Sequence, residues 1–450
     1  ETGGVFSRLG RAQLVTQDLL TEMCSEEIGE REVNEETLTY MFAKQFGTVQ
    51  VGMNTELELK PYLLNIGKLE TPVRYAVKSS LKPSPMFGVL GESVKVPVVL
   101  RTEGEVTPGI QKMQEAINKN EPCVKWSQSE IDRAKKAMYE SILTFKPVMQ
   151  VKHQRTIEEA ICGVKGCDTA KPMVLNTSVG FPFNYKFPNK KSIIERTDDK
   201  VMINLDMLTV HDENMGLRYN GEVPPTVFHC VLKDELKVPG KKHKPRLIQS
   251  GPTEYTIAVR RHFMDFTAAF YAGNLDSFSA VGMNCLGEDW EKLTYKLRFK
   301  DNIIAGDISA YGPTLQTEIV EAVYDVINHW YAVNAGNNQV MKKVRKVIGR
   351  EVTSSLNVAY DTLFKTECCS PSGQPLTTVV NTIALAMQLY MAWVSIMLKA
   401  GKENMISWAS YIKHVDTAIY GDDVVQSVCP LVADLYNNET LSEHFKERGI

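Results

Sequence analysis

Two adjacent carboxylates, Asp422 and Asp423, stand where two apolar runs meet. The stretch from Thr417 to Val428 reads TAIYGDDVVQSV, and apolar runs around a Gly-Asp-Asp turn predict a β-hairpin. Like charges 4 Å apart repel by about 4 kcal/mol at an effective dielectric constant of 20, so the pair is costly unless a cation lies beside it. Oxygen ligands without His or Cys favour Mg²⁺ or Mn²⁺. An ordinary acidic surface turn is the alternative that this tripeptide alone leaves open.

A third carboxylate, Asp307, lies near the end of a short apolar run, Asn302 to Ile308, which predicts a strand. A carboxylate at the end of a strand emerges at the edge of its sheet. If that edge faces the hairpin, the three acids form a clamp for two ions about 3.5–4 Å apart, which activate an attacking hydroxyl and a leaving oxygen. Asp307, Asp422 and Asp423 are therefore the predicted catalytic and metal-binding residues.

A basic cluster at 233–246, KDELKVPGKKHKPR, offers the cations that phosphoryl transfer requires on a triphosphate. Arg246 can grip a phosphate with two hydrogen bonds, whereas Lys233 and Lys237 act as point charges. A solvated basic loop is the alternative. Further along, Ser372 and Gly373 form a small polar loop that lets backbone approach a ligand, and Asn381 is a polar amide in the apolar helix that follows.

Several elements are expected around these residues. Ser127 followed by Glu130 predicts a capping box that opens a helix ending near Phe145. Pro313 is expected to open another helix, because proline is favoured at the first helical position. That helix has an apolar stripe at Leu315, Ile319, Val323 and Ile327. A last helix is expected from Thr440, with Glu443 completing its capping box and Gly449 ending it.

The composition places few limits on function. The chain has 450 residues, 43% hydrophobic and 23% charged, which predicts a globular protein of two or three lobes. A net charge of −3 gives no overall attraction to nucleic acid, so any RNA-binding surface must be a local basic groove. Nine cysteines without a close CxxC pair argue against a zinc site. The apolar stretch Thr382 to Leu398 is short for a membrane span and contains Gln388, so a buried helix is expected.

Five segments together resemble the RNA-dependent RNA polymerases of picornavirus-like viruses, and they occur in that family's order. Residues 177–182, TSVGFP, resemble a motif that guides the template strand. Residues 233–237, KDELK, with Arg246 resemble the fingertip that binds the incoming triphosphate. Asp307 resembles the first palm aspartate, residues 372–382 are similar to SGxPxTxxxNT, and residues 420–423 are similar to YGDD.

The resemblance implies an α+β right-hand polymerase fold and a role for each matching residue. Lys233, Lys237 and Arg246 would hold the triphosphate, and the 372–381 segment would read the ribose and the base pair. The implied nucleotide-binding residues are Lys233, Lys237, Arg246, Ser372, Gly373, Thr377 and Asn381, and the implied template-binding residues are Thr177, Ser178, Gly180 and Pro182. Asp307 and Asp422 would bind Mg²⁺, for which Mn²⁺ can substitute, and Asp423 would assist.

The resemblance also divides the chain. Residues 1–70 are expected to be an N-terminal extension, a protease tail plus a linker, because GRAQLVTQDLL resembles the end of a picornaviral cysteine protease. Fingers are expected at 71–260 with a return at about 335–371, and palm at 261–334 and 372–450. The thumb is expected to be largely missing. Many relatives have a second aspartate at the position of Gly312, and the glycine found here resembles some insect picorna-like viruses, iflaviruses among them.

The expected partners are an RNA template and primer, nucleoside triphosphates, a genome-linked protein primer and other viral replication proteins. The expected location is the host cytoplasm, at membrane-associated replication complexes, with no transmembrane segment in this chain. Two other functions remain open. A truncated, non-catalytic fragment would bind RNA without extending it, and a reverse transcriptase would also use palm acids but usually has a bulkier residue in place of Gly421.

Overall fold

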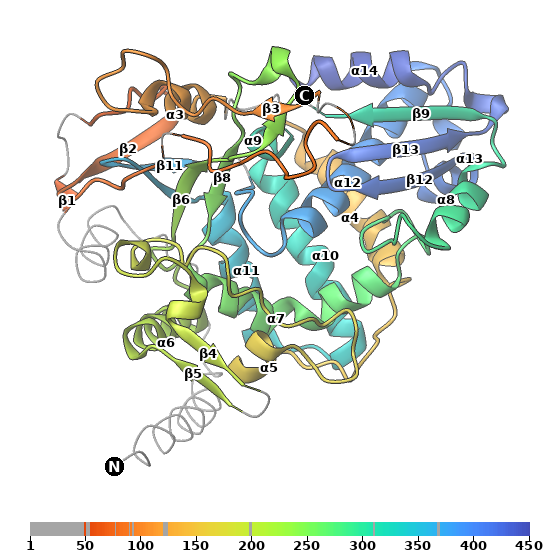
Figure 1. Cartoon of the computed structure of the whole chain (residues 1–450). Helices are drawn as coiled ribbons and strands as arrows, with labels where there is room; N and C mark the ends of the chain where they lie inside the picture. Colours follow the sequence, from red (N-terminus) through yellow and green to blue (C-terminus); the bar gives the residue numbers. More distant parts are fainter. Residues whose placement is uncertain are drawn as a thin grey trace.

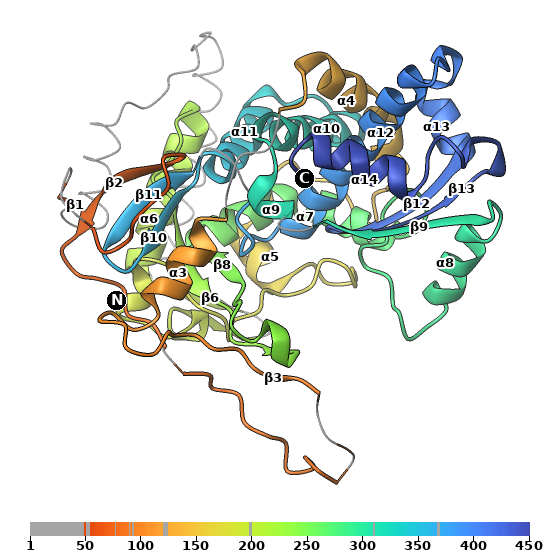
Figure 2. The ribbon, with the colours of Figure 1, turned by 90° about the horizontal axis from the view of Figure 1, so that it is seen from above.

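The computed structural model describes residues 49–450 except 51–54, 77, 90, 92–93, 120–124, 198–199, 309–310 and 367–369. The predicted protease-like segment therefore lies outside the described residues. Two β-sheets stand on opposite sides of the molecule, and long helices fill the space between them (Figure 1 and Figure 2). This arrangement agrees with the predicted α+β class.

The larger sheet has six strands. Their order is β1 (Val49–Gln50), β2 (Leu63–Leu69), β11 (Thr362–Thr366), β10 (Leu356–Ala359), β6 (Val227–Leu232) and β8 (Leu247–Ser250). Neighbouring strands are antiparallel except β10 and β6, which run parallel. Strands β1 and β2 come from the first 70 residues, and β2 pairs directly with β11.

The smaller sheet contains the predicted hairpin and the predicted strand. Its order is β12 (Val415–Tyr420), β13 (Asp423–Val428) and β9 (Asn302–Asp307), all antiparallel. Because side chains alternate across a strand, one face buries Ile304, Ile419 and Val428 in the main core. The opposite face presents the other set, which includes Asp307 and Asp423. We call this second face the catalytic face of the sheet.

Two small ribbons complete the strands. They are β3 (Val96–Pro97) with β7 (Leu236–Lys237), and β4 (Ile194–Arg196) with β5 (Val201–Ile203). The helices are α3 (Ile110–Ile117), α4 (Gln128–Ile142), α5 (Ile157–Cys162), α6 (Leu205–Asn220), α7 (Thr253–Ala272), α8 (Asp289–Leu297), α9 (Tyr311–Thr314), α10 (Thr317–Ala335), α11 (Gln339–Thr353), α12 (Thr377–Lys399), α13 (Trp408–His414) and α14 (Asn438–Glu447).

The main core forms where α4, α7, α10 and α12 pack together, around fully buried side chains such as Trp330 and Trp393. Helix α12 is long and apolar enough to cross a membrane by length and composition, but 94% of its most apolar window is buried inside the protein. A helix that is apolar on all sides is expected to be buried in the core of a protein or in a membrane. The predicted interpretation of this stretch as a core helix is confirmed.

The helix predictions are correct in kind and partly wrong in their boundaries. Helix α4 begins after Ser127 with the predicted capping box to Glu130. Pro313, by contrast, lies inside the short helix α9, and α10 begins only at Thr317 because Gln316 is extended. Helix α14 begins after Asn437, whose side chain caps it, so the predicted start at Thr440 was also wrong.

Candidate active site

The three predicted catalytic carboxylates meet at one end of the smaller sheet. Asp423 at the start of β13 is the direct cross-strand partner of Asp307 at the end of β9. Directly opposite residues of antiparallel strands have Cβ atoms about 4.5–5.5 Å apart and share one face. Asp422 precedes Asp423 in the turn. The structure therefore brings together acids separated by more than 100 residues, as the sequence interpretation requires.

The hairpin turn is fixed by the helix behind it. Gly421 has φ of 68°, a left-handed conformation that glycine adopts without strain. Its N–H donates to the Thr382 hydroxyl of α12 at 2.9 Å. On the other edge of β12, the N–H of Ala280 donates to the carbonyl of Ile419 at 2.8 Å. The turn bearing Asp422 is therefore held from both sides.

Electrostatic repulsion acts on the Asp422 carboxylate in this turn. The pKa of Asp422 is raised by its burial and then by the nearby charges of Asp423 and Asp307, while Arg246 opposes the shift. Among the described residues, no three His, Cys, Asp or Glu side chains already converge as a ligand set. The donors are nonetheless oxygen atoms only, which suits Mg²⁺ or Mn²⁺. Side-chain rotation would be needed to bring the carboxylates onto one ion.

The predicted triphosphate residues converge on a carboxylate that sequence interpretation missed. Arg246 donates to both carboxylate oxygens of Glu235, one at 2.8 Å, and these hydrogen bonds lower the pKa of Glu235. Lys237 lies 3.4 Å and Lys233 3.8 Å from the same carboxylate. The charge of Asp422 also helps to raise the pKa of Arg246. This basic cluster therefore lies within electrostatic reach of the catalytic carboxylates.

The loop of Ser372 and Gly373 is docked against the strand that follows Arg246. Gly373 donates to the carbonyl of Gln249 at 3.0 Å, and a Cβ at Gly373 would lie 2.5 Å from that oxygen. Glycine is thus required by close approach of backbone to backbone. The Ser372 hydroxyl lies 3.3 Å from the carbonyl of Leu247.

The predicted template loop presses on the same turn from another side. A Cβ at Gly180 would lie 2.5 Å from Cα of Pro252. Thr253 donates through its hydroxyl to the carbonyl of Val179 at 2.8 Å. The turn at 249–252, between β8 and α7, is therefore the common support of the predicted template loop and the predicted nucleotide loop.

Lys190 supports the template loop from within. Its ammonium donates to the Thr177 hydroxyl and to the Ser178 carbonyl, both at 2.7 Å, and burial lowers its pKa to about 8. Pro182 follows at the end of the loop, where the short helix Phe183–Tyr185 begins. These four predicted template residues form one continuous, anchored segment.

Asn381 and Thr377 of α12 differ in whether the side-chain oxygen has a hydrogen-bond partner among the described residues. Asn381 is 8% exposed, and its Oδ1 has no partner among the described residues, so it is available to a ligand. The Thr377 hydroxyl instead lies 2.9 Å from the carbonyl of Gln374, within its own loop. The carbonyl of Gly312 accepts from the N–H of Ser370 at 2.9 Å. This bond places Gly312 beside the segment that leads into the nucleotide loop.

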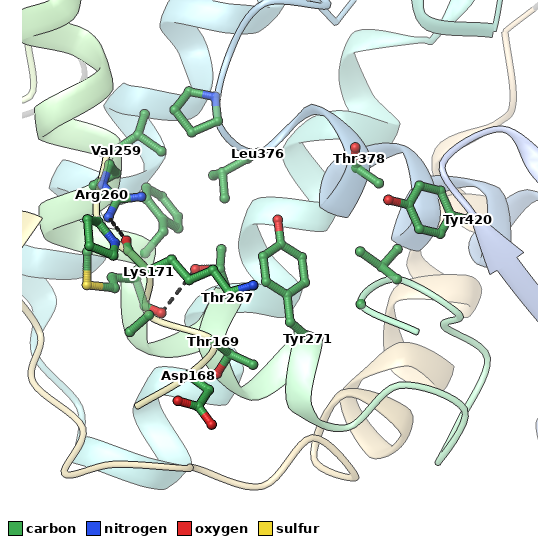
Figure 3. A pocket seen from close by; sticks show the side chains of 17 residues that line it. Asp168, Thr169, Lys171, Val259, Arg260, Thr267, Tyr271, Leu376, Thr378 and Tyr420 are labelled. Carbon is green, nitrogen blue, oxygen red and sulfur yellow. Dashed lines mark hydrogen bonds between the residues drawn. The ribbon is translucent and has the colours of Figure 1, made fainter. Parts of the chain in front are cut away.

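A cavity of about 350 Å³ opens beside the hairpin (Figure 3). Tyr420 and Thr378 line one side, and Tyr271 and Arg260 of α7 line the other. Arg260 donates to the carbonyl of Lys171 at 2.5 Å, and burial lowers its pKa to about 10. Sequence interpretation missed this cavity, because only tertiary packing brings α7 to the hairpin.

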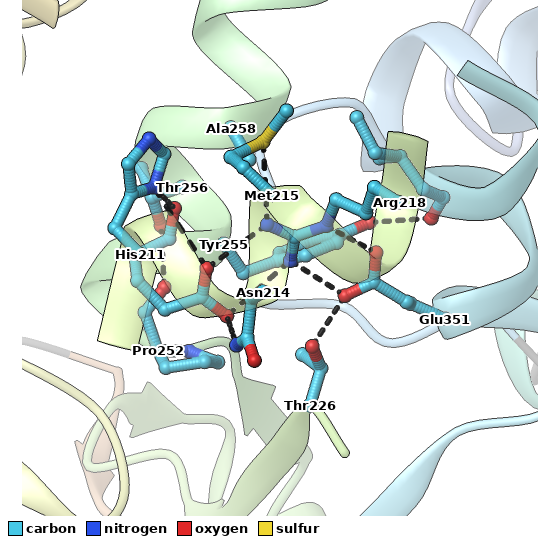
Figure 4. Close-up of polar contacts among 12 residues, drawn as sticks. His211, Asn214, Met215, Arg218, Thr226, Pro252, Tyr255, Thr256, Ala258 and Glu351 are labelled. Carbon is cyan, nitrogen blue, oxygen red and sulfur yellow. Dashed lines mark hydrogen bonds and ion pairs between the residues drawn. The ribbon is translucent and has the colours of Figure 1, made fainter. Parts of the chain in front are cut away.

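A buried ion network fixes the helices behind the site (Figure 4). Arg218 of α6, fully buried, donates to Glu351 of α11 at 2.8 Å and to Glu254 of α7 at 3.1 Å. Asn214 donates to Glu254 at 2.8 Å, and Thr226 donates to Glu351. The network thereby ties the first turn of α7, next to the turn at 249–252, to two further helices.

The sequence is similar to segments of viral polyproteins. The genome polyprotein of Deformed wing virus is 25% identical over 346 residues, which are 72% of this chain and 12% of that polyprotein. The replicase polyprotein of Acute bee paralysis virus is 25% identical over 399 residues, 86% of this chain and 21% of that polyprotein. The chain thus spans only a small part of the length of these relatives.

A solved structure shares the fold. It is the sicinivirus 3Dpol RNA-dependent RNA polymerase, which aligns with a TM-score of 0.66 and 19% identity over 86% of this chain and 75% of that one. This match confirms the right-hand polymerase fold. The family model described as viral RNA-dependent RNA polymerase matches residues 110–450, about three quarters of the sequence. The chain therefore belongs to the viral RNA-dependent RNA polymerase family.

Proposed function

We propose that this chain extends an RNA primer on an RNA template by two-metal nucleotidyl transfer, in the replication of a positive-strand viral genome. The observation that carries the proposal is the pairing of Asp423 with Asp307, beside Asp422 and within electrostatic reach of Arg246. Transfer of a nucleotidyl group requires carboxylates that bind metal ions, next to basic side chains that bind phosphates.

In the proposed reaction the primer 3′-hydroxyl attacks the α-phosphate of a nucleoside triphosphate, and pyrophosphate leaves. Asp307 and Asp422 would hold the divalent ions and Asp423 would assist. When bound, such ions lower the pKa of the attacking hydroxyl and neutralise charge on the leaving oxygens. Mg²⁺ is the expected ion and Mn²⁺ a substitute.

Arg246, Lys237 and Lys233 are proposed to hold the triphosphate. Glu235 accepts hydrogen bonds from Arg246 and forms ion pairs with both lysines, so it orients these cations and must share them with the incoming phosphates. Because Glu235 already restricts the side chain of Arg246, this side chain loses less conformational entropy when a phosphate binds. Glu235 is thus proposed to be a positioning residue for the triphosphate site.

The ribose and the template are assigned to the two loops on the turn at 249–252. Asn381, whose Oδ1 is buried without a partner, is proposed to contact the ribose, with Ser372, Gly373 and Thr377 shaping the pocket around it. Gly312 contributes no side chain, which leaves more of ribose selection to Ser372 and Asn381. The segment Thr177–Pro182 and the cavity at Arg260 are proposed to hold the template strand, because a cation there meets the phosphate backbone.

The division of the chain into fingers and palm, its partners and its location are also proposals. Residues 71–260 with 335–371 would form fingers, and 261–334 with 372–450 would form palm. A genome-linked protein primer, other viral replication proteins and membrane-associated complexes in the host cytoplasm are proposed as its partners and location.

Primer extension tests the proposal. A labelled RNA primer annealed to a defined RNA template is incubated with one NTP or one dNTP, in Mg²⁺ or in EDTA. Extension by the templated NTP in Mg²⁺ only is expected. Preferential dNTP incorporation would indicate a reverse transcriptase, and bound but unextended RNA would indicate a non-catalytic fragment.

A further inference from the structure

Helix α8 and the residues that follow it, 298–300, present an aromatic and basic surface that the proposed reaction does not use. None of its residues is buried. Trp290, Tyr295 and Phe299 are 56%, 58% and 60% exposed. From Lys292 to Lys300 the sequence KLTYKLRFK has four cations and no carboxylate. Interleaved aromatic and basic side chains are typical of surfaces that bind single-stranded nucleic acid.

The two rings and a cation form one ordered unit. The guanidinium carbon of Arg298 lies 4.1 Å from the ring centre of Tyr295 and 4.7 Å from that of Phe299. The two rings contact edge to face, with centres 5.0 Å apart. We call Tyr295, Arg298 and Phe299 the α8 platform. Stacking on aromatic rings fixes the planar guanidinium and leaves its N–H groups available to phosphate.

Two other cations of this segment are paired with carboxylates, whereas Arg298 has no such pair among the described residues. Lys292 pairs with Asp289 at 3.0 Å, and Lys300 pairs with Asp416 at 2.9 Å. Arg298 has no ion pair with any carboxylate of the described residues. A groove of about 910 Å³ runs beside it, lined by Trp290 and Tyr295. The surface therefore combines an unpaired cation, exposed rings and a groove.

The platform is rigidly attached on the catalytic side of the sheet. Leu293 of α8 packs with Val425 and Ala418, which lie on the same face as Asp423. Val425 is two residues from Asp423 along β13, about 7 Å at the usual rise. Lys296 clamps the helix by donating to the carbonyl of Leu275 at 3.1 Å. In Figure 2, α8 stands out from the smaller sheet on the side toward which the segment around β3 also projects.

We propose that the α8 platform binds single-stranded RNA that passes over the catalytic face, with bases stacked on Tyr295 and Phe299 and a phosphate on Arg298. The proposal rests on the proposed polymerase function for the identity of the polymer. RNA is favoured over an anionic membrane because the carboxylates of Glu288 and Glu291 border the platform at the start of α8. A flat, negatively charged bilayer would contact these carboxylates. An RNA strand can instead lie along the basic residues at the other end of the helix.

The test measures RNA affinity of the whole chain by fluorescence anisotropy with a labelled 20-nucleotide single-stranded RNA. Tyr295→Ala with Phe299→Ala is expected to weaken binding at least about tenfold. Arg298→Gln is expected to reduce the dependence of log affinity on log salt concentration by about 0.7. Tyr295→Phe should bind as the parent does. Leu431→Ala, which removes a side chain 83% exposed elsewhere, is the matched control and should have no effect.

Ultraviolet crosslinking followed by peptide mapping gives the second readout. RNA crosslinks within residues 290–299 are expected in the parent chain and in Asp422→Asn, because this variant keeps the platform. If primer extension fails while these crosslinks and the affinity loss remain, the polymerase proposal falls and the platform stands. Unchanged affinity in both platform variants would overturn it. So would a platform variant that loses binding to phosphatidylserine vesicles and keeps its RNA affinity.

Discussion

Replacing Asp422 by Asn should abolish nucleotide incorporation and yet stabilise the protein when no divalent ion is bound. In the folded chain Asp422 is half-buried beside the carboxylates of Asp423 and Asp307, and its raised pKa shows that its negative form is disfavoured there. In the unfolded chain all three charges are hydrated and Asp307 is remote, although Asp423 stays next to Asp422 in the sequence. Removing the Asp422 charge therefore relieves burial of a charge and repulsion from Asp307 chiefly in the folded state.

The size of the effect follows from the geometry. Two like charges 4 Å apart repel by about 4 kcal/mol at a dielectric constant of 20, and this is an upper value. Asp423 and Asp307 are exposed to solvent, and exposed ion pairs are worth roughly 0–1 kcal/mol each. Two such repulsions involve Asp422, so Asp422→Asn should stabilise by up to about 2 kcal/mol. In a chain of this length that corresponds to a rise in Tm of up to about 3 °C.

Thermal unfolding with and without Mg²⁺ measures both parts of this prediction. In EDTA the variant should melt above the parent. Added Mg²⁺ should stabilise the parent by about 1.4 kcal/mol at ten times its Kd, and should have little effect on the variant. Asp434→Asn removes an exposed carboxylate elsewhere and should behave like the parent in both conditions. A variant that melts lower in EDTA, or that gains as much from Mg²⁺ as the parent, would refute the reasoning.

Three further predictions concern the surroundings of the site. Arg246→Ala should lower kcat/KM for NTP by about 10- to 100-fold, because a charge-assisted hydrogen bond to phosphate is worth about 1.5–3 kcal/mol. RNA affinity should change less, and equal losses would contradict the assignment. Lys402→Ala, which removes an exposed cation outside the basic cluster, is the control. Gly373→Ala should destabilise by about 1–3 kcal/mol and raise KM for NTP, because its Cβ would meet the Gln249 carbonyl. Gly216→Ala in α6 meets no atom within 4 Å and should be harmless in the same unfolding and kinetic assays. Arg218→Ala should cost about 3–5 kcal/mol in denaturant unfolding, because two buried carboxylates lose their partner, and adding Glu351→Gln should recover part of that loss.

The local features of the site were predictable from the sequence. The apolar runs around Gly421 specify a hairpin, and the run before Asp307 specifies a strand, because period and turn residues are local signals. The structure adds what no local signal contains, namely that Asp423 and Asp307 are cross-strand partners. The order of the family's motifs pointed to that meeting, whereas the spacing along the chain alone did not.

The errors and omissions have physical causes. The start of α10 was misplaced because the chain extends at Gln316, whose side chain accepts from the N–H of Trp126 at 2.8 Å. That contact joins residues 190 positions apart. Glu235 was visible in the motif, but its role depends on β8 bringing Arg246 back beside it. The support of both loops by the turn at 249–252 likewise requires three segments to meet in space.

The most direct test of the central claim is single-nucleotide incorporation into a primer–template by this chain and by its Asp422→Asn variant. We predict that the parent adds the templated NTP in Mg²⁺ or Mn²⁺ and adds none in EDTA. The variant should add none although it still binds RNA. Equal incorporation by the variant, or none by the parent with RNA and NTP both bound, would contradict it.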